Sequence, residues 1–338
     1  MCETDSPFYA DLCRPRVPTR SLTACKEFAA SFNNTCAAES ELLTSVDQVQ
    51  GVELSCKNVL ACPTTITDGT NICRFTRKLC VQCYVSQGST RLRVLSNSFP
   101  SHCFNSDTPP SPNNLAFDTF FNPLFYDAQT LILDTLEKLN HQVCTYNVSG
   151  YPRGFEKASG VYTNIVGIAL TGVPISAGAN RQNWDPLFPL FQNVKSTIDA
   201  CLGDVDETGY HYLANSPCIQ SPLLRANESI DMCSSNTLCR FSRITSYMGG
   251  QAVKALAPVG VALDGRRIYG VYKGSNSVWG PCDVDVCNGR VINGDYSYVM
   301  SNFHPYTVSC WGPGNESVLR QTCSPNARSC QPPLIISP

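Results

Sequence analysis

Two short segments carry a pair of tyrosines around a single residue, and this pattern is the first candidate for chemistry. Tyr210-His211-Tyr212 and Tyr296-Ser297-Tyr298 both have the alternation typical of a β-strand. Alternate residues of a strand share a face and lie about 6.5–7 Å apart, so two histidines at this spacing could bind one metal ion. The position for a second histidine, two residues after the first, is occupied by Leu213 in one segment and by Val299 in the other. The aromatic face is therefore present twice, whereas the histidine face retains only one imidazole.

A metal site would have to draw on the few histidines of the chain. The sequence contains four, and His102, His211 and His304 stand beside the repeated segments described below. A protein metal site needs about three or four ligands. These three histidines are the candidates for such a site, and the alternative is that they are ordinary surface or core residues. We expect the alternative, with no resident metal and no other cofactor.

Other motifs have a spacing that could support catalysis or metal binding, but a structural role is commoner for each of them. Cys80-Val81-Gln82-Cys83 has redox or zinc spacing, but in a chain with 20 cysteines we expect structural disulfides. Asp283 and Asp285 would share one face of a strand and could bind Ca²⁺ or act as acid and base, although fixing a turn is the commoner role. No Gly-x-Ser-x-Gly motif occurs, and we expect no enzymatic activity. The basic pair Arg266-Arg267 is expected to be solvated.

The tyrosine segments belong to an internal duplication with a nearly constant offset, between 260 − 167 = 93 and 287 − 201 = 86 residues. In chain order, the matching landmarks are residues 167–175 with 260–268, 199–203 with 285–289, 209–213 with 295–299, and Cys218 with Cys310. Chance does not keep four landmarks in the same order at this spacing. The sequence therefore predicts two related β units.

The chain resembles the YHYH-domain family, a group of extracellular proteins, over residues 85–312. The segments that carry the resemblance are Ser96-Asn97-Ser98-Phe99-Pro100-Ser101-His102-Cys103, residues 167–175, Asp185-Pro186-Leu187-Phe188-Pro189, residues 199–203 and 209–218, residues 262–270, Cys287-Asn288-Gly289-Arg290, and residues 303–310. The family motif is Tyr-His-Tyr-His, and here it is degenerate in both copies. The resemblance implies an extracellular domain and no particular reaction.

Composition favours a secreted glycoprotein. Cytosolic reductants would keep 20 cysteines reduced, whereas an oxidising compartment pairs them. Four sequons, at Asn33, Asn147, Asn227 and Asn315, predict N-linked glycans. The net charge of −2 gives no reason to expect nucleic acid as a partner. No segment is long and apolar enough to span a membrane, and no signal peptide follows Met1, so a secreted form would have to be numbered after cleavage or lack its leader here.

The predicted fold class is mainly β: an internally duplicated, disulfide-rich, β-sandwich-like domain with a small cysteine-rich N-terminal module. We divide the chain into the module at 1–84, a β domain at 85–312 with copies at about 160–218 and 259–310, and a Cys/Pro-rich tail at 313–338. Ten cysteines lie at 2–103 and ten at 144–330, which permits two separate disulfide frameworks.

Local patterns predict individual elements within this division. Helices are expected within 22–32 and 38–46, and over 127–139 with Asp127 as N-cap. Strands are expected over 90–95, 161–170 and 259–263, a loop over 105–114, and turns at Asn293-Gly294 and Asp264-Gly265.

The C-terminal segment Leu334-Ile335-Ile336 is apolar and bounded by prolines. Such a segment can add to the sheet edge of another subunit, and the alternative is a frayed end. The leading hypothesis is thus a structural glycoprotein that forms a homopolymer, such as a fibril or surface assembly, by docking a terminal segment on its neighbour. The alternatives are a monomeric extracellular module that binds a glycan or a protein, which exposure of Trp279 and Trp311 would favour, and a metal-binding protein.

Overall fold

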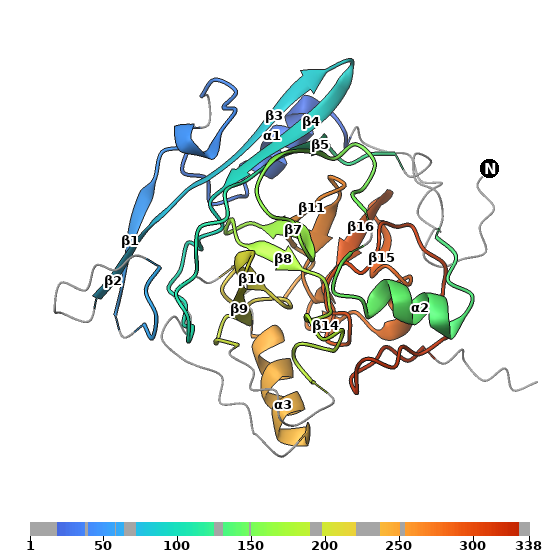
Figure 1. Ribbon diagram of the computed structural model, residues 1–338. Coiled ribbons are helices and arrows are strands. Elements are labelled where there is room, and N and C mark those ends of the chain that lie inside the picture. The colour runs from blue at the N-terminus through green and yellow to red at the C-terminus, as the bar shows by residue number, and fades with distance from the viewer. Residues whose placement is uncertain are drawn as a thin grey trace, which may run out of the picture.

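The computed structural model describes residues 19–37, 40–57, 59–63, 72–124, 131–148, 150–189, 198–220, 237–250 and 254–330, without the side chains of 237–241. The described chain is mainly β and contains several sheets (Figure 1). The helices are α1 (Leu22–Ala29), α2 (Leu136–Val143) and α3 (Thr237–Met248), with 3₁₀ turns η2 (Val46–Gln48) and η4 (Pro281–Asp283).

An eight-stranded sheet forms the centre, with strand order β15-β16-β12-β11-β7-β8-β10-β9. Its strands are β7 (Ile165–Ala169), β8 (Pro174–Ser176), β9 (Gly203–Asp206), β10 (Gly209–Tyr212), β11 (Pro258–Ala262), β12 (Arg267–Tyr269), β15 (Gly289–Ile292) and β16 (Asp295–Val299). Each copy of the duplication supplies four strands, and the order of one half mirrors the order of the other. The two predicted related β units are confirmed.

The two halves meet at the antiparallel pair β7 and β11. Ile168 lies opposite Val261, and Gly167 and Ala169 lie opposite Ala262 and Gly260. The pairing is therefore symmetric about a pseudo-twofold axis at the centre of the sheet. Outside this pair, the parallel contact of β8 with β10 is matched by the parallel contact of β12 with β16.

A second sheet of four strands packs on one face of the central sheet, in the order β3-β4-β5-β6. Its strands are β3 (Leu79–Ser86), β4 (Ser89–Ser96), β5 (Leu115–Phe120) and β6 (Glu156–Ser159). Leu92, Val94 and Phe117 from this sheet share one apolar core with Ile168 and Val261 of the central sheet. The predicted sandwich-like arrangement is thus present, because two sheets enclose a common core. Helix α1 adds Phe28 to this core.

The opposite face of the central sheet carries the repeated tyrosines. Tyr210, Tyr212, Tyr296 and Tyr298 lie in one large core cluster that also includes side chains from α2 and from the hairpin of β1 (Val52–Lys57) and β2 (Ile72–Arg77). A hairpin of β13 (Tyr272–Gly274) and β14 (Ser277–Val278) lies outside the main sheets.

The eight described disulfides fall into the two separate frameworks that the cysteine counts permit. They are Cys25–Cys83, Cys36–Cys80, Cys56–Cys103 and Cys62–Cys73 in the first, and Cys144–Cys323, Cys201–Cys218, Cys282–Cys330 and Cys287–Cys310 in the second. The two cysteines of the Cys-x-x-Cys motif therefore belong to different structural disulfides. The division placed between residues 84 and 85 falls inside β3, so the N-terminal residues share a sheet with those that follow.

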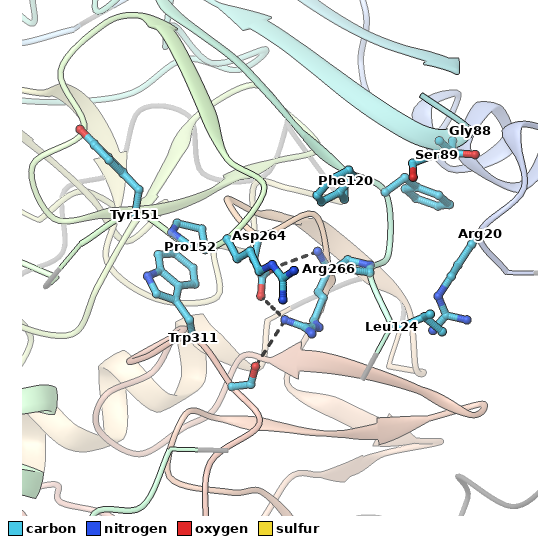
Figure 2. Close-up of a pocket in the computed structure, with 15 residues that line it drawn as sticks. Arg20, Gly88, Ser89, Phe120, Leu124, Tyr151, Pro152, Asp264, Arg266 and Trp311 are labelled. Carbon is cyan, nitrogen blue, oxygen red and sulfur yellow. Dashed lines mark hydrogen bonds and ion pairs between the residues drawn. The ribbon is translucent and has the colours of Figure 1, made fainter. Parts of the chain in front are cut away.

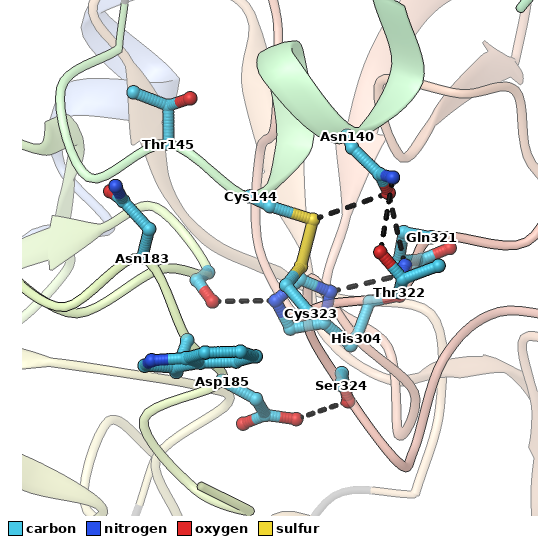
Figure 3. Close-up of a disulfide and its surroundings, with 12 residues drawn as sticks. Asn140, Cys144, Thr145, Asn183, Asp185, His304, Gln321, Thr322, Cys323 and Ser324 are labelled. Atoms are coloured by element: carbon cyan, nitrogen blue, oxygen red, sulfur yellow. Dashed lines mark hydrogen bonds between the residues drawn. A yellow bond between two sulfur atoms is a disulfide. The ribbon is translucent and has the colours of Figure 1, made fainter. Parts of the chain in front are cut away.

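Residues 313–330 are attached to α2 by a long-range disulfide. Cys144 at the end of α2 pairs with Cys323 across a sequence separation of 179 residues (Figure 3). Beside this disulfide, Asn140 exchanges two hydrogen bonds with Thr322, of 2.9 and 3.0 Å. Residues 313–330 therefore pack with the rest of the chain.

Several local predictions are confirmed and others are wrong. The strand expected at 90–95 lies within β4. The strands expected at 161–170 and 259–263 correspond to β7 and β11. The turns at 264–265 and 293–294 are present. The third predicted helix begins later than expected, because Thr135 caps it by accepting a bond from Lys138 N. Residues 40–45 are not helical, and η2 begins at Val46, the last residue of the predicted helix, of which residues 38 and 39 are not described. Asp127 lies outside the described residues.

The described residues contain no helix of the length and apolarity that crossing a membrane requires.

Candidate functional site

Each copy folds a tight turn around a buried aspartate. In the first copy, Asp199 Oδ1 accepts hydrogen bonds from the backbone N–H groups of Cys201 and Gly203, both at 2.9 Å. In the second copy, Asp285 Oδ1 receives the corresponding pair at 2.9 and 2.8 Å. The conserved order of landmarks in the sequence thus corresponds to one three-dimensional arrangement built twice.

The first tyrosine of each copy completes this turn. Tyr210 donates to Asp199 Oδ2 at 2.9 Å, and Tyr296 donates to Asp285 Oδ2 at 2.7 Å. All four residues are at most 2% exposed. The sequence identified the tyrosines and the aspartates separately, but the pairing between them required the structure because 11 residues separate the partners.

The second tyrosine of each copy reaches the turn between the first two strands of its half. Tyr212 Oη lies 3.2 Å from Thr171 Oγ1, and Tyr298 donates to Asp264 Oδ2 at 2.7 Å. Thr171 and Asp264 occupy equivalent positions, since 264 − 171 = 93 is the offset of the copies at this point. The copies therefore differ in charge here, with a hydroxyl in one and a carboxylate in the other.

Burial shifts the pKa values of the two turn aspartates and of the first tyrosine of each copy. It raises the pKa of Asp199 and of Asp285 to about 6, although hydrogen bonds from the tyrosines and from backbone N–H groups act in the opposite direction. Burial also raises the pKa of Tyr210 and Tyr296 well above the ordinary value. Both tyrosines are therefore proton donors at neutral pH, and both aspartates are mainly charged acceptors. The arrangement holds turns together and exposes no reactive group to solvent.

His102 belongs to this network in the first copy only. Its Nδ1 lies 2.7 Å from the carbonyl oxygen of Cys103, and its Nε2 contacts the hydroxyl of Tyr212. Burial lowers the pKa of His102 to about 4, so the ring is neutral, donates from Nδ1 and accepts at Nε2. Its imidazole lies within 4.8 Å of the sulfurs of Cys201 and Cys218, but these two form a disulfide. As paired, they offer no thiolate ligands.

The other two candidate histidines have separate partners. His211 Nδ1 lies 3.1 Å from the carbonyl oxygen of Gly209 and 3.5 Å from Asp206 Oδ1. His304 Nε2 lies 2.6 Å from the carbonyl oxygen of Gly178. Among the described residues, the group of possible metal ligands around His102 includes neither of them. Each of the three imidazoles thus takes part in its own local hydrogen bonds.

The two acidic residues before Cys287 do not share a strand face. Asp283 ends the 3₁₀ turn η4 and binds Lys273 at 2.6 Å, whereas Asp285 is buried and holds the turn described above. The prediction of a strand at this position was wrong. Asp285 instead has the alternative role that was considered, because it fixes a turn.

The basic pair Arg266-Arg267 was expected to be solvated, and the structure differs from this expectation at Arg266. Arg266 is 3% exposed and its Nη1 lies 2.6 Å from Asp264 Oδ2. Arg267 packs its guanidinium over Phe28 and Phe121 at 5.2 and 5.3 Å from the ring centres. Arg267 is half-exposed, so the expectation was wrong only for Arg266, whose burial depends on contacts that the sequence does not show.

A third aspartate–tyrosine pair was not predicted. Tyr306 donates to Asp185 Oδ2 at 2.6 Å, and Asp185 Oδ1 accepts from the N–H groups of Leu187 and Phe188 at 2.8 and 3.0 Å. Asp185 and Tyr306 lie 121 residues apart in sequence. Only the Asp-Pro-Leu-Phe segment itself gave a signal, and no local spacing indicated the partner.

No family model matches this chain, and no curated protein or solved structure matches it.

Proposed function

We propose that this chain is an extracellular, N-glycosylated structural protein that forms a fibril or surface assembly. The observation that carries the proposal is the use of the repeated polar residues: Asp199, Tyr210, Asp285 and Tyr296 are buried and bonded to one another. A pair of disulfides, Cys201–Cys218 and Cys287–Cys310, closes the same two turns. This use of polar groups favours a rigid scaffold. We also propose membership of the YHYH-domain family on the residues given above.

An extracellular location is supported by the disulfides and by the accessible sequons. Asn33 and Asn147 are exposed, so both can accept a glycan without disturbing the core. Asn315 is half-buried, and its side-chain oxygen accepts a hydrogen bond of 3.0 Å from Leu133 N. We therefore assign glycans first to Asn33 and Asn147. Asn227 lies outside the described residues.

Assembly requires an acceptor surface, and the described sheets supply open edges. In the four-stranded sheet, β6 is a terminal strand with all four residues exposed. An extended apolar segment from another subunit can pair with such an edge through main-chain hydrogen bonds. The proposed donor, Leu334-Ile335-Ile336, lies outside the described residues. A contact of this kind between different surfaces produces rings or open filaments.

The test compares the native glycoprotein with a variant that lacks residues 331–338. We expect polymers for the intact protein and monomers for the shortened variant, measured by light scattering after size exclusion and by electron microscopy. A variant that lacks residues 1–14 tests whether the other terminus is the donor. A monodisperse monomer for the intact glycoprotein would refute the proposal.

A further inference from the structure

A pocket of about 960 Å³ opens beside the β11–β12 turn of the second copy (Figure 2). The turn is held tightly against β5: Asn122 N donates to Gly265 O at 3.0 Å, and a Cβ at Gly265 would lie 1.6 Å from Phe120 O. Asp264 and Arg266 flank this glycine and line the pocket. The volume is typical of sites for small organic ligands, and the lining is anchored to both sheets.

The equivalent turn of the first copy is covered by the chain itself. Arg77 Nε donates to Thr171 O at 3.4 Å, and Ser96 Oγ donates to Gly172 O at 2.7 Å. The side chain of Leu79 comes within 3.3 Å of the position that a Cβ of Gly172 would take. Polar and apolar groups of the protein thus pack on one turn, while its pseudo-symmetric counterpart borders an open pocket.

The charges around the pocket favour an anion. Arg20, Arg153 and Arg266 line it, together with the carboxylate of Asp264, and Arg20 is paired with Asp295 at 2.9 Å, so the preference for an anion rests on the other two arginines. Asp264 is already engaged, because it accepts 2.6 and 2.7 Å bonds from Arg266 and Tyr298. Burial acts to lower the pKa of Arg266, but the neighbouring carboxylate outweighs it, so the guanidinium stays charged. Among the described residues, Arg266 Nε has no hydrogen-bond partner.

Aromatic side chains form another part of the lining. Figure 2 shows Trp311 and Tyr151 at one end of the pocket and Arg20 at the other. Trp311 is oriented by a 3.3 Å hydrogen bond from its Nε1 to Gly150 O. Tyr151 is 56% exposed and stacks on Phe155 with 4.8 Å between ring centres. These rings offer apolar faces to a ligand that also carries polar groups.

We propose that this pocket binds an acidic sugar, with its ring against Trp311 or Tyr151 and its carboxylate or sulfate toward Arg153 and Arg266. Arginine pairs with both anions through two parallel hydrogen bonds, and the aromatic faces pack against the C–H groups of a sugar ring. A neutral sugar would gain the second contact but not the first. The inference does not depend on polymer formation, because the pocket lies within one chain.

Binding is tested on the intact glycoprotein by isothermal titration calorimetry. The probes are 3′-sialyllactose for a carboxylate, a chondroitin sulfate disaccharide for a sulfate, and lactose as the neutral control. We expect at least one acidic probe to bind more than tenfold tighter than lactose and to weaken as salt rises from 50 to 500 mM. Equal affinity for lactose and the acidic probes, or no binding of any acidic probe at about 10 mM, would overturn the proposal.

Two exposed residues allow variants that keep the fold. Arg153→Gln should weaken binding of the acidic probe about tenfold, because the charge-assisted bond is lost, and Tyr151→Ala should weaken it by a similar factor. Arg320→Gln removes an exposed arginine outside the pocket and should leave the affinity unchanged. Unchanged affinity in both pocket variants, or an equal loss in the control, would show that the sugar binds elsewhere.

Discussion

At the scale of single residues, buried aspartates accept the hydroxyl hydrogen bond of three of the four repeated tyrosines, all except Tyr212. Asp285 accepts bonds from two backbone N–H groups of its own turn, from Gly314 N at 2.8 Å and from Tyr296. An acceptor with this many donors needs a carboxylate, which offers about four lone-pair sites. The side chain of Asp285 therefore connects its own turn, strand β16 and the segment around Gly314.

Asp285→Asn should show how protonation of this carboxylate affects stability. Burial raises the folded-state pKa of Asp285 to about 6, above the 3.8 of an unperturbed aspartate. A raised pKa contributes stability that is fully present below about pH 4 and is lost as pH rises through about 6. Asparagine cannot titrate, so the variant lacks this contribution. The gap in melting temperature between the wild type and the variant should be several degrees wider at pH 4.5 than at pH 7.

Differential scanning calorimetry at both pH values measures this gap. We choose the second copy because His102, which also titrates, contacts the tyrosine network of the first copy. A gap that does not change with pH would mean that the hydrogen bonds to Asp285 offset its burial.

At the scale of elements, each turn is shaped by a close approach between a glycine and a tyrosine ring. A Cβ at Gly203 would lie 2.2 Å from Tyr210 Oη, and a Cβ at Gly289 would lie 1.9 Å from Tyr296 Oη. The positions need glycine for lack of space, since both tyrosines are buried and fixed by their aspartates. Residues 202 and 288 before these glycines adopt positive φ angles of 57° and 60°. The turn is thus specified by several consecutive residues.

Gly289→Ala should be strongly destabilising, by about 3 kcal/mol or more, because the added methyl group displaces a buried, hydrogen-bonded tyrosine. Gly274→Ala is the matched control, since a Cβ there meets nothing within 4 Å. Denaturant unfolding of the purified variants measures both effects. A loss below about 1 kcal/mol for Gly289→Ala would show that Tyr296 can move without losing its bond.

Local sequence patterns predicted strands and turns better than helices or partners. The alternation around Val94 and the Asn293-Gly294 turn are short-range signals, and both elements are present. The burial of Arg266 and the pairing of Asp185 with Tyr306 depend on contacts between distant segments, which no local pattern encodes. Helix α2 begins later than predicted because Thr135 provides its N-cap. The duplication was visible because both copies retain the turn residues.

At the scale of the whole molecule, disulfides connect segments that are far apart in the chain. The disulfide between Cys144 and Cys323 joins residues 179 positions apart, whereas the one between Cys62 and Cys73 joins residues 11 positions apart. In the chain-entropy account, a disulfide stabilises by restricting the unfolded chain, and the effect grows with the logarithm of loop length. The long cross-link should therefore contribute more.

The double variant Cys144→Ser/Cys323→Ser should lose about 5 kcal/mol of stability, and Cys62→Ser/Cys73→Ser about 3 kcal/mol. Thermal unfolding with the remaining disulfides intact measures both losses. Equal losses, or a larger loss for the short loop, would show that native-state packing rather than loop length determines the contribution. The hydrogen bonds between Asn140 and Thr322 remain in the first variant and limit the structural change.

The pseudo-twofold axis between β7 and β11 also has an evolutionary consequence. After a duplication, two copies of one unit have the same surroundings only if nothing else in the chain breaks their symmetry. Here the four-stranded sheet packs on one turn through Leu79 and Ser96 and on the other through Phe120, so the two turns came under different constraints. One copy can preserve the framework while the other changes its polar residues. Thr171 and Asp264, which descend from one ancestral position in such a history, record that divergence.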